Sequence, residues 1–414
     1  MPVLDPGEQA RAIAILRDPA TIRARSHALL ALGVQGRLAH FSVDLSRLDD
    51  AAEYVAAVIR QAYPSLEIPY HARWRHFAAG GRDRWGALVA TLGGTDAAEI
   101  ARVRFDLCVV SVLLDAGAGA AWRFIEPGTG EAIARSEGLA VASLHAFRAG
   151  LFSGDPDRKL RADAAGLSAL TAASLADAFQ ASPDNPLEGL EGRAALLRAL
   201  GKVLAERPGL FGEDPRVGGL YDALLAQATD GALPATAILA AILDGLGPIW
   251  PDRLQLGGQS LGDVWQHPAV EAPDATAGLI PFHKLSQWLS YSLVEVLEES
   301  GLRVTGLDAL TGLPEYRNGG LFLDLGVIAL RDPSLASRPL AVSDPAIVEW
   351  RALTVALLDR IADPIRTRLG RTAADLPLAR ILEGGTWAAG RRIAGERRPG
   401  GGPPLTVLSD GTVF

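Results

Sequence analysis

Hydrophobic residues recur along most of the chain at intervals of three and four positions, the spacing of one face of an amphipathic helix. In one such stretch Asp18 and Pro19 precede the apolar positions and Gly33 follows them, which predicts an N-cap, a proline in the first turn and a stop. Further helices are expected over Leu48–Ala62, Asp96–Leu114, Leu167–Phe179, Gly192–Glu206, Gly218–Ala228, Thr236–Leu243, Lys284–Glu299 and Ala346–Leu369. Helices therefore dominate the predicted structure.

Strand patterns are few and short. They occupy Leu38–Val43, Trp122–Ile125, Leu321–Ile328 and Leu405–Leu408. We predict a mainly α fold, in which a multi-helix globular domain carries small β elements around its loops. Because no internal repeat or long biased linker interrupts the chain, residues 1–414 are expected to form a single domain, either undivided or with a smaller lobe over residues 151–245.

Composition narrows the class of protein. The 414 residues are 49% hydrophobic and 21% charged, which indicates a sizeable core, and the net charge of −8 disfavours a generic nucleic-acid binder. The apolar runs are shorter than a bilayer span and no signal-peptide pattern stands at residue 1, so we expect a soluble cytoplasmic protein without a membrane partner. The one cysteine, Cys108, allows no intramolecular disulfide. Seven scattered histidines give no metal-site spacing, and we expect neither a metal nor a cofactor.

A dense group of polar residues stands beside an apolar run within Thr311–Leu325. Arg317 and Asn318 offer fixed hydrogen-bond donors, and Glu315 offers an acid, a base or an anchor. Polar groups packed so closely against leucine and phenylalanine must either form hydrogen bonds with one another or bind a ligand. The composition favours a small polar ligand.

A second polar face is expected on the helix that follows Pro281. Its members recur at spacings of three or four: Lys284, Gln287, Tyr291 and Glu295. His283 and Lys284 lie in the first turn, where unpaired backbone N–H groups can meet an anion. The face is either an ordinary solvated surface or one wall of a pocket, and its Gln and Tyr favour the wall.

Three more segments hold candidates. The segment His71–Phe77 contains Arg73 and Arg75. These arginines could bind a phosphate or a carboxylate, and the alternative is that they stack on the tryptophan between them. Asp115 opens a glycine-containing turn and Asp263 has apolar and glycine neighbours, where burial can shift the pKa of a carboxyl group. The segment 258–262 matches the Gly-x-Ser-x-Gly string, but it lacks the preceding strand and following helix of a nucleophile elbow, so we expect a chance match.

Six segments together resemble the uracil-catabolism family of the URC pathway in bacteria and fungi. They are Arg73–Phe77, Leu114–Gly119, Arg135–Leu139, Pro281–Leu289, Leu313–Phe322 and Ser409–Phe414. The resemblance covers nearly the full length. It implies a part in reductant-independent uracil breakdown, downstream of a cyclohydrolase-like ring-opening enzyme, at the step that processes a ribosylurea-type intermediate.

Residues 282–291 also resemble a helix of the queuosine-nucleotide N-glycosidases, with the pattern Asp-Tyr-Arg-x-Pro-Gln-x-Leu-x-Tyr. The matching positions include His283, Lys284, Gln287 and Tyr291, and the segments 261–265 and 315–317 are similar too. This resemblance implies a helical architecture like that of the helix-hairpin-helix DNA glycosylases. The sequence departs from the pattern at Phe282, where that family has Asp, so a catalytic carboxylate must come from elsewhere.

Both resemblances imply cleavage of a ribosyl C1′–N bond, which releases urea from ribosylurea or its 5′-phosphate. Such cleavage needs a carboxylate near C1′, a positioned water and a proton donor for the leaving nitrogen. The hypothesis assigns these roles as follows: Glu315 or Asp263 as the carboxylate, His283 and Tyr291 as donors to the urea, Arg317 and Asn318 on the ribose hydroxyls, Lys284, Arg73 and Arg75 on a phosphate, and Gln287 and Asp115 as further binding residues. Two alternatives stay open: an amidohydrolase acting on the urea moiety, and a non-catalytic partner of the ring-opening enzyme. Oligomeric state is not predicted.

Overall fold

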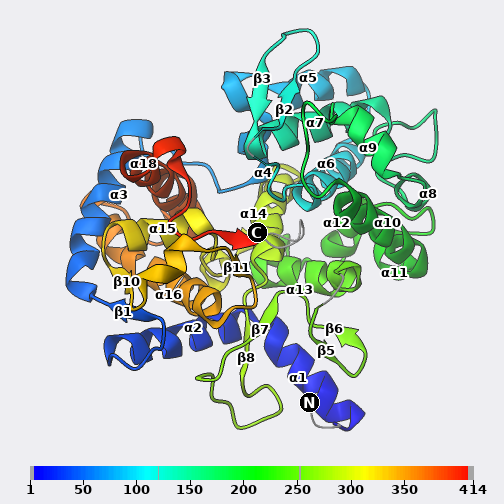
Figure 1. Cartoon of the computed structure of the whole chain (residues 1–414). Helices are drawn as coiled ribbons and strands as arrows, with labels where there is room; N and C mark the ends of the chain where they lie inside the picture. The colour runs from blue at the N-terminus through cyan, green and yellow to red at the C-terminus, as the bar shows by residue number, and fades with distance from the viewer. Residues whose placement is uncertain (1–3, 120, 251–252, 409–414) are drawn as a thin grey trace. The chain divides into compact units, whose positions relative to one another are not determined.

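The computed structural model describes residues 4–119, 121–250 and 253–408, and within them helices carry most of the chain (Figure 1). Internal contacts group these residues into two compact units. The first falls within 1–71, 252–288 and 306–408, and the second within 72–251 and 289–305. The expected lobe over 151–245 lies entirely in the second unit, and the prediction of a single domain stays a prediction.

The first unit is built around one long, buried helix, α16 (Pro345–Leu369). Asp344 caps this helix and Pro345 opens it, and its first half is buried almost without interruption, so it packs against α2, α3 and α15. The unit's helices are α1 (Pro6–Arg17), α2 (Pro19–Val34), η1 (Leu45–Arg47), α3 (Leu48–Ala62), η5 (Leu307–Ala309), α15 (Tyr316–Asp324), η6 (Pro333–Ser337), α16, α17 (Leu378–Ile381), η7 (Leu382–Thr386), α18 (Trp387–Arg397) and η8 (Pro399–Gly401).

Short two-stranded ladders close the loops of the first unit. β1 (Phe41–Val43) pairs antiparallel with β10 (Ile328–Leu330), so that Phe41 lies opposite Leu330. The remaining pairs are β5 (Gln255–Leu256) with β6 (Gln259–Ser260), β7 (Val264–Gln266) with β8 (Leu279–Pro281), and the parallel pair β11 (Leu340–Ala341) with β12 (Val407–Leu408).

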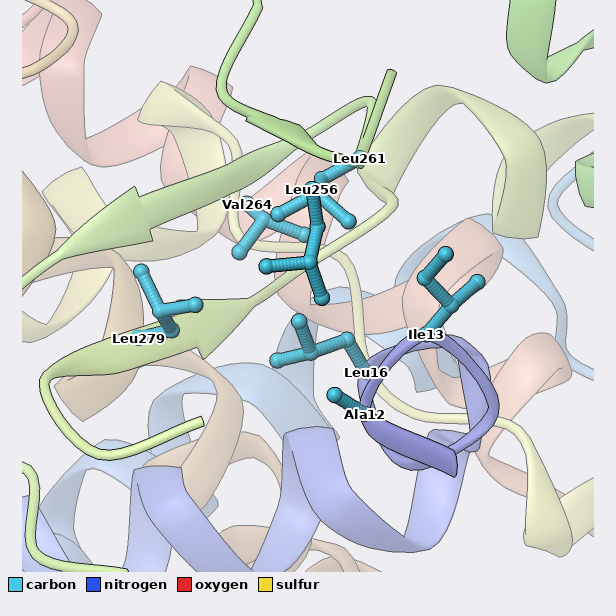
Figure 2. Packing of buried hydrophobic residues seen from close by; sticks show 7 residues of the cluster. All are labelled: Ala12, Ile13, Leu16, Leu256, Leu261, Val264 and Leu279. Atoms are coloured by element: carbon cyan, nitrogen blue, oxygen red, sulfur yellow. The ribbon is translucent and has the colours of Figure 1, made fainter. Parts of the chain in front are cut away.

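Helix α1 is held on these hairpins by a small hydrophobic cluster (Figure 2). Ala12, Ile13 and Leu16 point from one face of α1 toward leucine and valine side chains of the segments around β5 to β8. Those partners are Leu256, Leu261, Val264 and Leu279. The cluster therefore fixes the segment that carries Asp263 against the N-terminal helix.

The second unit packs its helices around α6 (Ala97–Leu113) and α7 (Arg135–Ala149), which are largely buried. Its other helices are α4 (Arg73–Phe77), η2 (Ala79–Gly81), α5 (Arg84–Val89), η3 (Ala90–Leu92), α8 (Ala164–Ser168), α9 (Ala172–Ala178), α10 (Leu190–Glu206), α11 (Pro208–Phe211), α12 (Gly219–Leu225), α13 (Ala235–Leu246) and η4 (Gly247–Ile249). β2 (Arg123–Ile125) pairs antiparallel with β3 (Ala132–Ala134), and β4 (Ala232–Pro234) pairs parallel with β9 (Arg303–Thr305). Helix α14 (Lys284–Glu299) contributes its first residues to the first unit and the rest to the second.

The mainly α prediction is confirmed, and most helices lie where apolar spacing placed them. Asp18 accepts the backbone N–H of Ala20 and caps α2 as expected. The helix expected over residues 167–179 is instead two, because Thr171 and Ser174 form a capping box that starts α9.

One strand prediction is wrong. Residues 321–324 belong to α15, which begins after Glu315, and only Ile328 enters a strand, β10. An unbroken apolar run is typical of both a buried helix and a buried strand. Here the carboxylate of Glu315 caps the N-terminus of the segment, which favours the helix.

Two further observations bear on function. The segment around Ser260 is the β5–β6 hairpin, turned at Gly257 and Gly258 with positive φ, and is not a strand-to-helix elbow. Within the described residues, no helix has both the length and the apolar character needed to span a membrane. The matched terminal segment 409–414 lies outside the described residues.

Candidate functional site

The residues predicted for the site fall into two groups, one in each unit. The first unit holds Asp263, His283, Lys284, Gln287, Glu315, Arg317 and Asn318, and the second holds Arg73, Arg75, Asp115 and Tyr291.

Glu315 is a buried carboxylate at the N-terminus of α15. Its Oε2 accepts the backbone N–H of Arg317 at 2.8 Å, its Oε1 accepts that of Asn318, and only 7% of the residue is exposed. Burial raises the pKa of this carboxyl group, and the two N–H donors and the nearby Lys284 and His71 offset that effect only in part. The helix end therefore fixes both oxygens while the group keeps a pKa above that of an ordinary glutamate.

The first unit also contains a pair formed by His71 and Glu383, which the sequence alone does not indicate. The His71 Nδ1 and Glu383 Oε2 atoms lie 2.6 Å apart, and His71 is only 4% exposed. The rings of Trp288 and Trp387 lie beside the imidazole, with centroids 6.2 and 5.7 Å away. Since the charge of His71 acts on Glu315, the structure combines two carboxylates and an imidazole in one region of this unit.

Glu383 lies in η7, a π-helical turn between α17 and α18. Single π-turns are uncommon and occur often at functional sites. Gly384 and Gly385 let the turn pack closely on its neighbours, because a Cβ at either position would meet a buried side chain at 2.9 Å. The signal available in the sequence was a glutamate followed by two glycines after an apolar run.

Asp263 is an anchor whose oxygens are fully engaged. Oδ1 accepts from Arg351 Nη1 at 2.7 Å and the Trp265 indole N–H at 2.6 Å. Oδ2 accepts from Arg351 Nη2 at 2.7 Å and the Lys284 backbone N–H at 2.9 Å. Burial raises the pKa of Asp263, but the Arg351 charge and these bonds outweigh it, so the pKa lies below the usual range. Four donors leave little capacity for a substrate, which favours a structural role.

The Arg351 guanidinium also lies 4.3 Å from the centre of the Phe282 ring, at the position where the similar glycosidase pattern has Asp. Phe282 is fully buried. Phe282 thus fills this position with hydrophobic and cation–π packing, and the same arginine forms an ion pair with Asp263.

His283 joins β8 to α14 with a φ of +46°. Its Nε2 donates to the Leu16 carbonyl at 2.9 Å, so Nδ1 is the acceptor nitrogen of the neutral ring. Burial lowers the pKa of His283, which favours that neutral form. A ring held in this way ties α1 to α14 and is a poor proton donor to a leaving group.

Gln287 is committed to a backbone contact, whereas Asn318 keeps one polar atom available. Gln287 donates to the Thr311 hydroxyl and the Phe282 carbonyl and accepts the Thr311 N–H at 2.7 Å. Asn318 donates to the Leu313 carbonyl at 3.1 Å, while its buried Oδ1 has no hydrogen-bond partner within the described residues. Arg317 donates to the Gly401 carbonyl at 2.7 Å.

In the second unit, Arg73 and Arg75 each hold a carboxylate of the protein itself. Arg73 is fully buried, with Nη1 2.8 Å from Asp115 Oδ1 and Nε donating to Ser111. Burial raises the pKa of Asp115, but Arg73 and its other partners outweigh it and leave the pKa below the usual value. Arg75 pairs instead with Glu295 at 2.6 Å. The two arginines therefore form separate ion pairs, and Tyr291 is buried at 1% exposure.

The glycine turn after Asp115 is occupied by an arginine that the sequence did not single out. Arg193 is fully buried and donates to the carbonyls of Ala116 at 2.9 Å and Gly117 at 2.8 Å. Because Arg193 binds these backbone carbonyls, the turn has a structural role. Among the described residues, no three His, Cys, Asp or Glu side chains gather as metal ligands would.

Comparison with known proteins adds an independent line of observation. A family model with the description "Protein of unknown function (DUF1688)" matches residues 15–414. The chain is 42% identical over 402 residues to "Protein urg3" of Schizosaccharomyces pombe, covering 95% of this chain and 96% of that protein. It is 39% identical over 408 residues to "Uracil catabolism protein 4" of Lachancea kluyveri, covering 91% and 92%.

Proposed function

Because this chain belongs to the DUF1688 family, and a relative that matches it over nearly its whole length is named for uracil catabolism, we propose that it acts in uracil catabolism as an N-glycosidase. Its substrate would be ribosylurea or the 5′-phosphate, hydrolysed at the bond between ribose C1′ and a urea nitrogen. The role in uracil catabolism rests on the relatives, and the reaction rests on the chemistry of the first unit.

The observation that carries the reaction is the buried carboxylate of Glu315. Departure of urea leaves positive charge on C1′ and the ring oxygen, and a fixed carboxylate stabilises that charge or takes a proton from the attacking water. Two backbone N–H donors hold Glu315 in place. Its raised pKa suits proton exchange near neutral pH better than an ordinary glutamate does.

His71 is the group we assign to the leaving nitrogen. Water adds to C1′ as the C1′–N bond breaks, the water proton passes to Glu315, and a proton from the imidazolium of His71 completes urea. Glu383 holds the ring at 2.6 Å, as a carboxylate orients a catalytic histidine. The rings of Trp288 and Trp387 lie beside that imidazole, and His71 is only 4% exposed. The Asn318 Oδ1 accepts from a ribose hydroxyl, and Lys284 supplies the charge for a 5′-phosphate.

The test is an assay of purified protein with ribosylurea and with its 5′-phosphate, measuring urea, ammonia and free sugar. Urea and ribose (or ribose phosphate) in equal amounts are the expected products. Ammonia would indicate an amidohydrolase, and absence of turnover on both substrates would favour a non-catalytic partner of the ring-opening enzyme.

A pair of variants separates chemistry from folding. Glu315→Gln keeps one of the two acceptors of the α15 cap and removes the charge, so we expect kcat to fall by about 100-fold or more, and the Tm of the same variant reports any loss of the cap. Asp344→Asn makes the same change at the cap of α16 in the same unit and should leave turnover intact. Full activity of Glu315→Gln would overturn the assignment of this carboxylate.

A further inference from the structure

A cavity of about 360 Å³ lies within the second unit, and none of the first-unit groups that carry the proposed reaction lines it. Its walls include two tryptophans and two ion pairs, formed by Trp74, Trp85, Arg75, Arg104, Glu295 and Glu299. That volume is in the range of small-ligand pockets. The cavity takes no part in the proposed glycosidase reaction.

Arg104 is the centre of this cavity's chemistry. The residue is only 5% exposed, and its guanidinium lies 4.4 Å from the ring centre of Trp74 and 5.4 Å from that of Trp85. It pairs with Glu299, while its buried Nε has no hydrogen-bond partner within the described residues. Because the Nε is closed to solvent, the Nη atoms that hold Glu299 are the donors that an acceptor in the cavity can reach.

Arg75 repeats the arrangement on the same wall. Its Nη2 lies 2.6 Å from Glu295 Oε2, and its Nε is buried without a hydrogen-bond partner in the described part of the chain. Glu295 and Glu299 are one helical turn apart on α14, so the two arginines face two carboxylates of one helix.

The two pairs differ in how firmly the carboxylate is held. The Glu295 side chain is 14% exposed, but that of Glu299 is 62% exposed. A carboxylate so exposed loses little when it returns to water, because it is already largely hydrated. An incoming anion can therefore replace Glu299 on Arg104, whereas Glu295 stays with Arg75.

The rest of the lining limits the kind of anion. Trp85 is partly exposed and offers a ring face, which favours a flat ring on the ligand. Four arginines and three carboxylates line the cavity, and this balance suits a single anionic group better than a polyanion such as a nucleoside triphosphate. Trp74 is fixed by its indole N–H, which donates to the Ser292 carbonyl at 2.7 Å, so the ring wall is rigid.

We propose that this cavity binds a small molecule with one flat ring and one anionic group. The anion replaces Glu299 on the Nη atoms of Arg104, and the ring packs on Trp85. A pyrimidine nucleoside monophosphate and a heteroaromatic monocarboxylate share this chemistry, and the experiment distinguishes them.

The experiment measures binding to the full chain by calorimetry and by quenching of tryptophan fluorescence. The probes are uridine 5′-monophosphate, pyridine-3-carboxylate, uridine and inorganic phosphate, each up to about 5 mM. We expect one ring-bearing anion to bind at least about tenfold more tightly than uridine or phosphate, since each lacks half of the recognition. The stronger of the two ring-bearing anions identifies the class.

Variants of opposite sign separate a binding site from a packing cluster. Glu299→Gln frees Arg104 from a competitor, so affinity for the anion should rise several-fold, and Arg104→Gln should lower it by about tenfold or more. Glu191→Gln, at an exposed ion pair with Arg198 on α10, away from the cavity lining, is the matched control and should change nothing. Absence of binding by both ring-bearing anions, or weaker binding in Glu299→Gln while circular dichroism is unchanged, would overturn the proposal and leave only arginine–tryptophan packing.

Discussion

Replacing Asp263 by asparagine should destabilise the first unit strongly although the side chain keeps its shape. Each carboxylate oxygen of Asp263 accepts two donors, one of them from the Arg351 guanidinium. In the asparagine variant the amide NH₂ would face two of these donors whichever way the group turned. The change therefore removes the negative charge beside Arg351, whose side chain is 1% exposed, and also places donors against donors.

The size of the loss follows from the burial of the pair. Breaking a buried ion pair by removing one partner costs about 3–5 kcal/mol, because the remaining charge is left uncompensated. Each kcal/mol lowers the melting temperature of a domain of 150–250 residues by about 2–4 °C, so the Tm should fall by roughly 6–20 °C. The measurement is thermal and urea unfolding by far-UV circular dichroism.

Asp44→Asn is the matched control. Asp44 also caps a helix and pairs with an arginine of the first unit, but both side chains are more than half exposed, at 52% and 59%. Asparagine caps helices as well as aspartate does, so this variant should unfold like the wild type. Adding Arg351→Met to Asp263→Asn should recover part of the lost stability, because no buried charge remains. A wild-type Tm for Asp263→Asn would refute the structural role and restore Asp263 as a candidate for catalysis.

Three more outcomes are expected. Glu383→Gln should lower kcat on ribosylurea by about 10–100-fold with little change in KM, because His71 loses the partner that orients it. Steady-state kinetics and thermal unfolding of this variant are the measurements, and a joint fall of Tm and kcat would indicate a role limited to folding. If ionised Glu315 is required, kcat/KM should rise with pH through a pKa above that of an ordinary glutamate, and Glu315→Gln should abolish this acid limb in a pH–rate profile. Cys108 is fully buried and burial raises its pKa to about 12, so the thiol should react with alkylating reagents in denaturant and not in the native protein, as mass spectrometry would record.

The sequence predicted those parts of the fold that are encoded locally. Apolar spacing located α3 at the observed bounds, and Asp18 and Asp96 marked the starts of α2 and α6 through caps that need only a few neighbouring residues. The wrong strand over residues 321–328 has a local cause as well, since an apolar run does not distinguish a buried helix from a buried strand. The ladder of β1 with β10 joins segments far apart in the sequence, and no local pattern specifies such a pairing.

The candidate site shows the same limit. Glu315 stood out because acidic, basic and amide groups were crowded beside leucine and phenylalanine, a signal contained within ten residues. Glu383 did not stand out, because its significance depends on His71, which approaches it only in the folded unit. Apolar neighbours mark Asp263 in the sequence, but the arginine that gives it a structural role comes from α16. Spacing along one helix could not reveal either partner.

The division of the chain between its units has a consequence for biosynthesis. The main body of the second unit is continuous, from residue 72 to 251, and can begin to fold as soon as it leaves the ribosome. The first unit must wait, because its N-terminal helices α2 and α3 bury their apolar faces against α16, which is translated near the end. Nascent α2 and α3 therefore carry exposed hydrophobic surface throughout most of translation, and chains that stop short of α16 leave that surface open to chaperones and aggregation.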